Sequence, residues 1–129
     1  EVDAESAGIL RVRCTGGRRF TFSAAPQQQA DGLWTAPVAP LPDDPLLAPD
    51  AALLPAVRAL AHAIGALERQ GNTPFDKPYR FDDAAWVGNR WCELLPVSLA
   101  AKQKLMELDD PQLRLKLVDE FLRGKGVVS

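Results

Sequence analysis

The residues best spaced for chemistry are Ser98 and Lys102, which lie four positions apart in the segment PVSLAAKQKLM. On a helix this spacing places both side chains on one face, where a neutral lysine could activate a serine hydroxyl as a nucleophile. The neighbouring residues include no apolar cage that would desolvate the ammonium group. We therefore interpret Ser98 as a helix N-cap and Lys102 as a solvated side chain, and we predict no enzymatic activity from this pair.

Arrangements that bind phosphate or metal are incomplete. The sequence has no GxxxxGK[ST] loop, and its nearest string, GKG at 124–126, fits the end of a helix. His62 is the only histidine, and Cys14 and Cys92 form no CxxC pair. We therefore predict no metal and no cofactor. Both cysteines lie in apolar patterns, so we expect reduced core thiols rather than a disulfide, which favours a cytoplasmic protein.

The remaining charged clusters have structural interpretations that compete with functional ones. The carboxylate pairs at 43–44 and 109–110 stand beside prolines, where turn and capping roles suit them better than acid–base catalysis. A group of arginines near the start of the chain could contact phosphate. Because no exposed aromatic alternates with them, we favour a solvated sheet face, or one that pairs with acidic chain. These residues are Arg11, Arg13, Arg18 and Arg19.

Length and composition bound the class of protein. The 129 residues carry a formal net charge of -2, and 47% of them are hydrophobic. This suits one domain, or a small piece joined to a helical bundle, with enough apolar residues for a core. The slightly acidic balance argues against a dedicated nucleic-acid binder. No apolar run reaches the length of a membrane-spanning helix, so we expect no membrane association.

The first third of the chain predicts strands. GILRVRC and RRFTFS alternate apolar and polar residues and are separated by two glycines, so they predict an antiparallel hairpin. QQQADG predicts a loop, and LWTAPVAPL predicts a third strand that Pro37 and Pro40 confine to an edge. We expect this incomplete sheet to self-associate through its unpaired edge, or to be completed by other chain. Its apolar residues are Leu10, Val12, Phe20 and Phe22.

A proline-rich linker, PLPDDPLLAPD, leads into a helical region. The first predicted helix ends at Gly71 and has an apolar stripe of Leu53, Val57, Leu60, Ile64 and Leu67. Asp82 or Asp83 should cap a second helix, which stops before Pro96. Ser98 should cap the third, and Asp110 with Pro111 should begin the fourth. For the fourth helix we expect a stop at Gly124 and a stripe of Leu113, Leu117, Val118 and Phe121.

Aromatic residues gather around the third strand and the loop GNTPFDKPYRF. Most should belong to the core. The alternative is that proline-stiffened rings form a shallow apolar groove, which would lose little entropy on binding. The candidate groove residues are Trp34, Phe75, Tyr79 and Phe81.

The order of these motifs resembles the Lon protease N-terminal domain family, the Lon substrate-binding domain. GILRVRCTGGRRF resembles the family hairpin G-x-L-x-V-x-x-x-G-x-x-R-F, and LWTAPVAPLPDD resembles the strand that leads into the helical half. The C-terminal helices resemble the family's closing segment, with L-P, K-Q-x-L and D-x-x-x-R-L motifs. The closing matches are Trp86, Leu95, Pro96, Lys102, Gln103, Leu105, Glu107, Asp110, Arg114 and Leu115.

The resemblance implies an α+β fold: a remnant of a PUA-like antiparallel β pseudobarrel with about three strands, followed by a four-helix array. Residues 1–45 would be a partial β subdomain and residues 46–129 the helical subdomain. The family's earlier strands have no counterpart here, so we expect the C-terminal portion of such a domain. No catalytic residue carries over, because this family domain has none.

The implied function is non-catalytic recognition of unfolded or degron-bearing polypeptide, either in a stand-alone Lon-domain protein or in a full protease. Two alternatives come from other classes. The PUA-like relation and the arginines suggest a nucleic-acid-binding module, and the aromatics suggest a small-ligand pocket. Salt separates the first two, because phosphate binding weakens steeply with salt and apolar binding does not.

Overall fold

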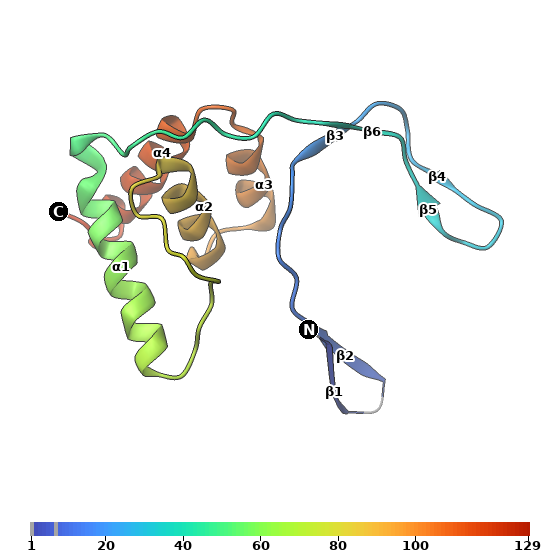
Figure 1. The fold of residues 1–129 in the computed structure, drawn as a ribbon, viewed down its shortest axis with the longest axis horizontal. Coiled ribbons are helices and arrows are strands. Elements are labelled where there is room, and N and C mark those ends of the chain that lie inside the picture. Colours follow the sequence, from blue (N-terminus) through green and yellow to red (C-terminus); the bar gives the residue numbers. More distant parts are fainter. Residues whose placement is uncertain (1, 7) are drawn as a thin grey trace. The chain divides into compact units, whose positions relative to one another are not determined.

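The protein is described here by a computed structural model that covers residues 2–6 and 8–129. Its chain divides into two compact units, Glu1–Asp43 and Asp44–Ser129. The first is made of strands and the second of helices (Figure 1).

The described residues of the first unit form short antiparallel ladders of two strands each. One joins β1 (Val2–Ser6) to β2 (Ile9–Val12). Another joins β3 (Phe20–Phe22) to β6 (Val38–Pro40), and the third joins β4 (Gln27–Gln28) to β5 (Trp34–Thr35).

The expected hairpin between residues 8–14 and 18–23 is wrong, because β2 pairs with the preceding strand and β3 pairs with β6. The loop expected at QQQADG instead contains β4 and a tight turn. In that turn Gly32 has a φ of +87° and donates its N–H to the carbonyl oxygen of Gln29 at 2.9 Å. This turn closes the β4–β5 hairpin and brings β3 and β6, which flank it, into register. A local turn thus decides the pairing that alternation alone did not.

The strand unit has no buried side chain among residues 8–43. Leu41 is half-buried. The other large apolar residues among 8–43 are 46–66% exposed, and they are Ile9, Leu10, Val12, Phe20, Phe22, Leu33, Trp34 and Val38. Cys14 is also exposed, so its assignment to a core is wrong. Two-stranded ladders of two to five residues cannot cover both of their own faces, so these side chains stay in contact with water.

The second unit holds four α-helices, the first preceded by a 3₁₀ turn. Their bounds are η1 (Ala51–Leu53), α1 (Leu54–Arg69), α2 (Ala84–Leu94), α3 (Leu99–Glu107) and α4 (Pro111–Gly124). The core gathers apolar residues from all of these except α3, whose side chains include none that is fully buried. The indole N–H of Trp91 donates to the carbonyl oxygen of Ala56 at 2.9 Å, which joins α2 to α1.

The predicted caps begin the helices as expected. The carboxylate of Asp83 accepts from the N–H of Ala85, and the Ser98 hydroxyl accepts from Ala101. Asp110 accepts from two N–H groups in the first turn of α4. The fourth helix ends at Gly124 as predicted, but the left-handed residue expected there is Gly126, which has a φ of +70°.

The predicted stripe of α4 is only partly correct. Leu113 and Leu117 are 42% and 40% exposed. The buried apolar residues of the helix are Leu115, Val118 and Leu122. The buried face of the helix is therefore offset from the predicted stripe. It also carries Arg114, a charged residue that a count of apolar positions excludes.

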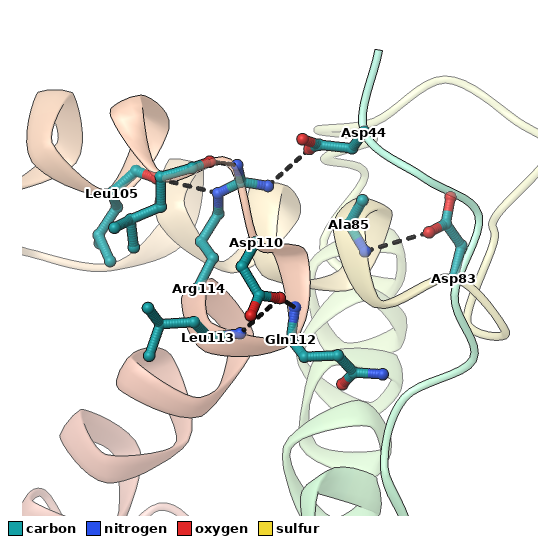
Figure 2. A network of polar contacts seen from close by, with 9 residues as sticks. Asp44, Asp83, Ala85, Leu105, Asp110, Gln112, Leu113 and Arg114 are labelled. Atoms are coloured by element: carbon teal, nitrogen blue, oxygen red, sulfur yellow. Dashed lines mark hydrogen bonds and ion pairs between the residues drawn. The ribbon is translucent and has the colours of Figure 1, made fainter. Parts of the chain in front are cut away.

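Arg114 is 1% exposed and joins three segments of the helical unit (Figure 2). Its Nε donates to the carbonyl oxygen of Leu105 at 2.9 Å, and another guanidinium nitrogen donates to that of Leu108. Its third nitrogen lies 2.7 Å from the carboxylate of Asp44. The guanidinium thus occupies the corner between α3 and α4 and attaches the linker to it. The buried charge is stable there because its donors have partners.

The linker is also attached by Gln112 of α4. The Gln112 side chain donates to the carbonyl oxygen of Ala48 at 2.5 Å and accepts from the N–H of Asp50 at 3.3 Å. The N–H of Ala84, at the start of α2, donates to the carbonyl oxygen of Leu47 at 2.8 Å. The segment has no regular secondary structure between 41 and 50, yet from Asp44 onward it is part of the helical unit.

One helical stretch, Ala51–Arg69, is long and apolar enough to cross a membrane by length and composition alone. The sequence pattern did not single it out, because Arg58, His62 and Glu68 interrupt it. In the helical unit its apolar face supplies core residues, which include Leu60 and Ile64. Core helices pass the same test, so this is weak evidence for a membrane span.

Candidate functional site

The two residues with the best spacing for nucleophilic chemistry are both engaged in structural contacts. The Ser98 hydroxyl accepts the N–H of Ala101 at 3.1 Å. The Lys102 ammonium donates to the carbonyl oxygen of Glu93 at 3.1 Å, across the break between α2 and α3. Ser98 therefore caps a helix as predicted. Lys102 is not the solvated side chain that we expected, because it is half-buried and braces the corner before the helix.

Within residues 2–6 and 8–129, no group of three or more His, Cys, Asp or Glu side chains could hold a metal ion. Cys92 is half-buried, and burial raises the pKa of its thiol despite the nearby Arg114. A raised pKa keeps the thiol protonated near neutral pH, which makes it a poor nucleophile and a poor metal ligand. His62 is exposed on α1 and lines a shallow depression with Gly65 and Arg69.

Three of the four predicted groove residues lie together in the helical unit, around Trp86. The Phe81 ring packs edge-on against Trp86 with centroids 5.4 Å apart, and Tyr79 lies 5.9 Å from Trp86. Phe75 completes the group at 6.3 Å from Trp86. These edge-to-face and tilted contacts are the arrangements that aromatic quadrupoles favour. The loop residues therefore form one aromatic cluster with the first turns of α2.

The side chains of the aromatic cluster differ in their exposure to solvent. Phe75 is 6% exposed and belongs to the core. Tyr79, Phe81 and Trp86 are half-buried and supply the surface of the cluster. The fourth predicted residue, Trp34, belongs to β5 of the strand unit, where it is 64% exposed.

Arg90 is a member of the cluster that the sequence analysis missed. Its guanidinium lies 5.4 Å from the centroid of Phe75 and 5.9 Å from that of Trp86, within cation–π range. It also pairs with Glu93 at 2.5 Å. Its place four residues after Trp86 on α2, on the same helix face, was a signal that could have identified it.

Tyr79 is fixed by a polar contact at its far end. Its hydroxyl donates to a carboxylate oxygen of Glu68 on α1 at 2.5 Å. This hydrogen bond, together with burial and the negative charge of Glu68, raises the pKa of the Tyr79 phenol above its ordinary value. The bond ties the loop to α1 and so fixes the position of the ring.

A second feature lies in the strand unit, at the β3–β6 ladder. Ser23 donates its N–H to the carbonyl oxygen of Pro37 at 3.0 Å, and Leu41 donates to that of Arg19 at 2.9 Å. In an antiparallel ladder, hydrogen-bonded pairs alternate with pairs that are not hydrogen-bonded. In this register Phe20 opposite Pro40 and Phe22 opposite Val38 are therefore the pairs that make no mutual bonds.

The N–H and C=O groups of Phe20 and Phe22 consequently point away from β6, toward the outer edge of β3. No other strand of the described chain pairs with that edge. The outer edge of β6 differs, because Pro40 has no N–H to offer there. Of the two edges, only that of β3 has its full set of backbone donors.

The same residues form an apolar face. Residues directly opposite each other share one face, so Phe20, Phe22, Val38 and Pro40 lie on the same side of the ladder. The two phenyl rings contact each other edge-on with centroids 6.0 Å apart, and each is more than half exposed. The ladder thus combines an open backbone edge with an aromatic surface beside it.

The comparisons with known proteins agree with this architecture. A crystal structure of a Lon N-terminal domain protein from Xanthomonas campestris matches the chain with a TM-score of 0.60 and 29% sequence identity. The match covers 92% of this chain and 60% of the other, so this chain spans less than two thirds of that protein's length. No family model matches the sequence, and no curated protein does.

The structural match confirms the resemblance predicted from the motifs. The chain has an α+β, Lon N-terminal domain-like fold, with several short antiparallel strands followed by four helices. The Lon N-terminal domain, which it resembles, lacks the protease active site.

Proposed function

We propose that this chain is a non-catalytic recognition module that binds unfolded or degron-bearing polypeptide. The observation that supports it best is the outer edge of β3, where the outward backbone groups of Phe20 and Phe22 adjoin their two exposed rings. Unfolded polypeptides share two features, unpaired backbone groups and exposed apolar side chains. A strand edge beside an aromatic face complements both of them at once.

The expected mode is the addition of an extended polypeptide segment as a third strand beside β3. Main-chain hydrogen bonds to Phe20 and Phe22 would give affinity that is largely independent of sequence. Alternate side chains of the segment would meet the phenyl face, which would favour apolar residues. The resemblance to a Lon N-terminal domain protein adds support, and the relation of the strand unit to a PUA-like barrel is part of the same proposal.

The backbone component can be tested with two variants that differ in one hydrogen-bond donor. Phe22→Ala removes the ring and keeps the outward N–H, whereas Phe22→Pro removes both. One hydrogen bond contributes about 0.5–1.5 kcal/mol, so Phe22→Pro should bind a labelled, reduced and carboxymethylated model protein about two- to tenfold more weakly than Phe22→Ala. Fluorescence anisotropy with the full chain measures both affinities.

The aromatic component requires a separate comparison. The double change Phe20→Ser and Phe22→Ser should weaken binding by at least about tenfold, because exposed aromatics dominate such contacts. The matched control is Leu46→Ser with Leu99→Ser, which removes two well-exposed apolar side chains from the helical unit. Equal losses in both double variants would mean that binding is non-specific adhesion to apolar surface, and the proposal would fail.

Two further outcomes would show that the β3 edge binds something other than unfolded polypeptide. If sedimentation shows a dimer of the wild-type chain that Phe22→Pro dissociates, the edge serves self-association. A steep loss of affinity for a single-stranded oligonucleotide at raised salt, with no binding of the unfolded protein, would instead favour nucleic acid. The strand unit gives that alternative little support, because its Arg18 already lies 3.8 Å from the carboxylate of Asp43.

A further inference from the structure

A groove in the helical unit lies outside both features described above. It has a volume of about 670 Å³ and is bounded by η1 and by the face of α4 that runs from Gln112 to Arg123. Its apolar lining includes Leu53, which is buried, and Leu113, which is 42% exposed. The volume falls within the range of ligand-binding clefts, roughly 300–1,000 Å³.

The walls of the groove carry more negative than positive side chains. Four carboxylates and two cations line it. Arg123 lies 2.6 Å from Asp119 on the same helix, so these two charges largely balance each other. Asp110 accepts hydrogen bonds at the start of α4. The excess negative charge comes from Asp50 and Glu120, which face a single further cation among the lining residues, Lys116.

Asp50 and Glu120 are suited to bind a ligand because neither carboxylate makes a capping hydrogen bond at a helix end. Asp50 begins η1 through its backbone carbonyl, which accepts from Leu53 at 2.8 Å, and its side chain makes no cap hydrogen bond. Glu120 is exposed in the interior of α4. Their charges are therefore available to a cationic partner.

The groove is elongated. Eleven helical steps separate Gln112 from Arg123, which corresponds to about 16 Å along α4 at 1.5 Å per residue. An extended peptide of about five residues spans this distance at roughly 3.3 Å per residue. A compact small molecule would fill one end only, so the shape favours a peptide.

We infer that this groove binds a short, extended peptide segment that places an apolar side chain on Leu53 and Leu113 and carries lysine or arginine next to it. The choice of occupant follows from charge complementarity, since the excess carboxylates attract a cationic segment and repel an acidic one. The inference rests on the proposed function in that the ligand is polypeptide. It names a separate site in the other unit, with a preference for basic segments.

The test uses labelled hexapeptides and the full chain. A peptide of alternating leucine and lysine should bind at least about tenfold more tightly than the same peptide with glutamate in place of lysine. The double change Asp50→Asn and Glu120→Gln should weaken the leucine–lysine peptide about three- to tenfold, because two exposed charge contacts are lost. Leu113→Ser should weaken it as well, whereas Asp82→Asn with Asp43→Asn, which changes net charge equally outside the groove, should not.

Phe22→Pro separates this site from the β3 edge. The inference predicts that the leucine–lysine peptide binds the Phe22→Pro variant and the wild-type chain with equal affinity. This result is expected even if the unfolded model protein binds neither of these two chains. If Phe22→Pro abolishes peptide binding, or if the groove variants and the matched control behave alike, the groove is not the site. Equal affinity for the lysine and glutamate peptides would also overturn the inference.

Discussion

Replacing Arg114 should destabilise the helical unit more than any surface change, because this buried side chain joins the α3–α4 corner to Asp44 of the linker. Arg114→Met keeps most of the apolar stem and removes the charge. The Asp44 carboxylate then loses its ion pair with Arg114, and the carbonyl oxygens of Leu105 and Leu108 lose the hydrogen bonds from the guanidinium. Removing one partner of a buried ion pair costs about 3–5 kcal/mol. Because a domain of this kind is stable by roughly 5–15 kcal/mol, the variant should fold marginally.

The assay is urea unfolding followed by far-ultraviolet circular dichroism, which reports the helical unit because the described residues of the other unit form no helix. Asp44→Ala should also be destabilising. The double variant should cost less than the sum of the single changes by about 2–3 kcal/mol, since both remove the same interaction. Arg58→Met, which removes an exposed arginine from α1, should stay within about 0.5 kcal/mol of wild type. A loss below about 1 kcal/mol for Arg114→Met, or additive single changes, would refute the reasoning.

Three further predictions concern the aromatic cluster and the thiols. Phe75→Ala should lose about 3–5 kcal/mol in the same unfolding assay, because the ring is buried. Tyr79 is the only tyrosine, so ultraviolet titration should place its pKa above 10, and Glu68→Gln should lower that pKa. Because the pKa is raised in the folded state, the stability that the neutral phenol contributes should be present below pH 10 and be lost as pH rises through the folded-state pKa. A thiol reagent near neutral pH should modify exposed Cys14 at least about tenfold faster than Cys92, whose pKa burial raises, and equal rates would contradict this.

The helix boundaries followed from the sequence because capping is local. Ser98, Asp83 and Asp110 each bond to an N–H two or three residues away, so a short window contains the whole interaction. The strand pairing did not follow in the same way. β3 pairs with β6 only because a turn at Gly32 closes the hairpin between them, and the alternation in RRFTFS fits several partners equally well.

The buried face of α4 was mispredicted for a different reason. Charged residues are seldom fully buried, so a stripe built from apolar positions omits Arg114 and includes Leu113 and Leu117, which are exposed. Its burial depends on Asp44, which is distant in sequence, and on two carbonyl groups at a helix corner. The aromatic cluster was predicted by composition, but the depth of Phe75 below Tyr79 and Phe81 depends on how the loop packs on α2.

Amide hydrogen exchange at β3 tests the central claim most directly, because the claim is that an extended polypeptide bonds to the outer edge of this strand. The N–H groups of Phe20 and Phe22 point outward and should exchange freely in the unliganded chain, whereas that of Thr21 faces β6. At saturating unfolded polypeptide, nuclear magnetic resonance should show slower exchange at Phe20 and Phe22 and little change at Thr21. Unchanged exchange at both phenylalanines, with the polypeptide demonstrably bound, would contradict recognition by strand addition.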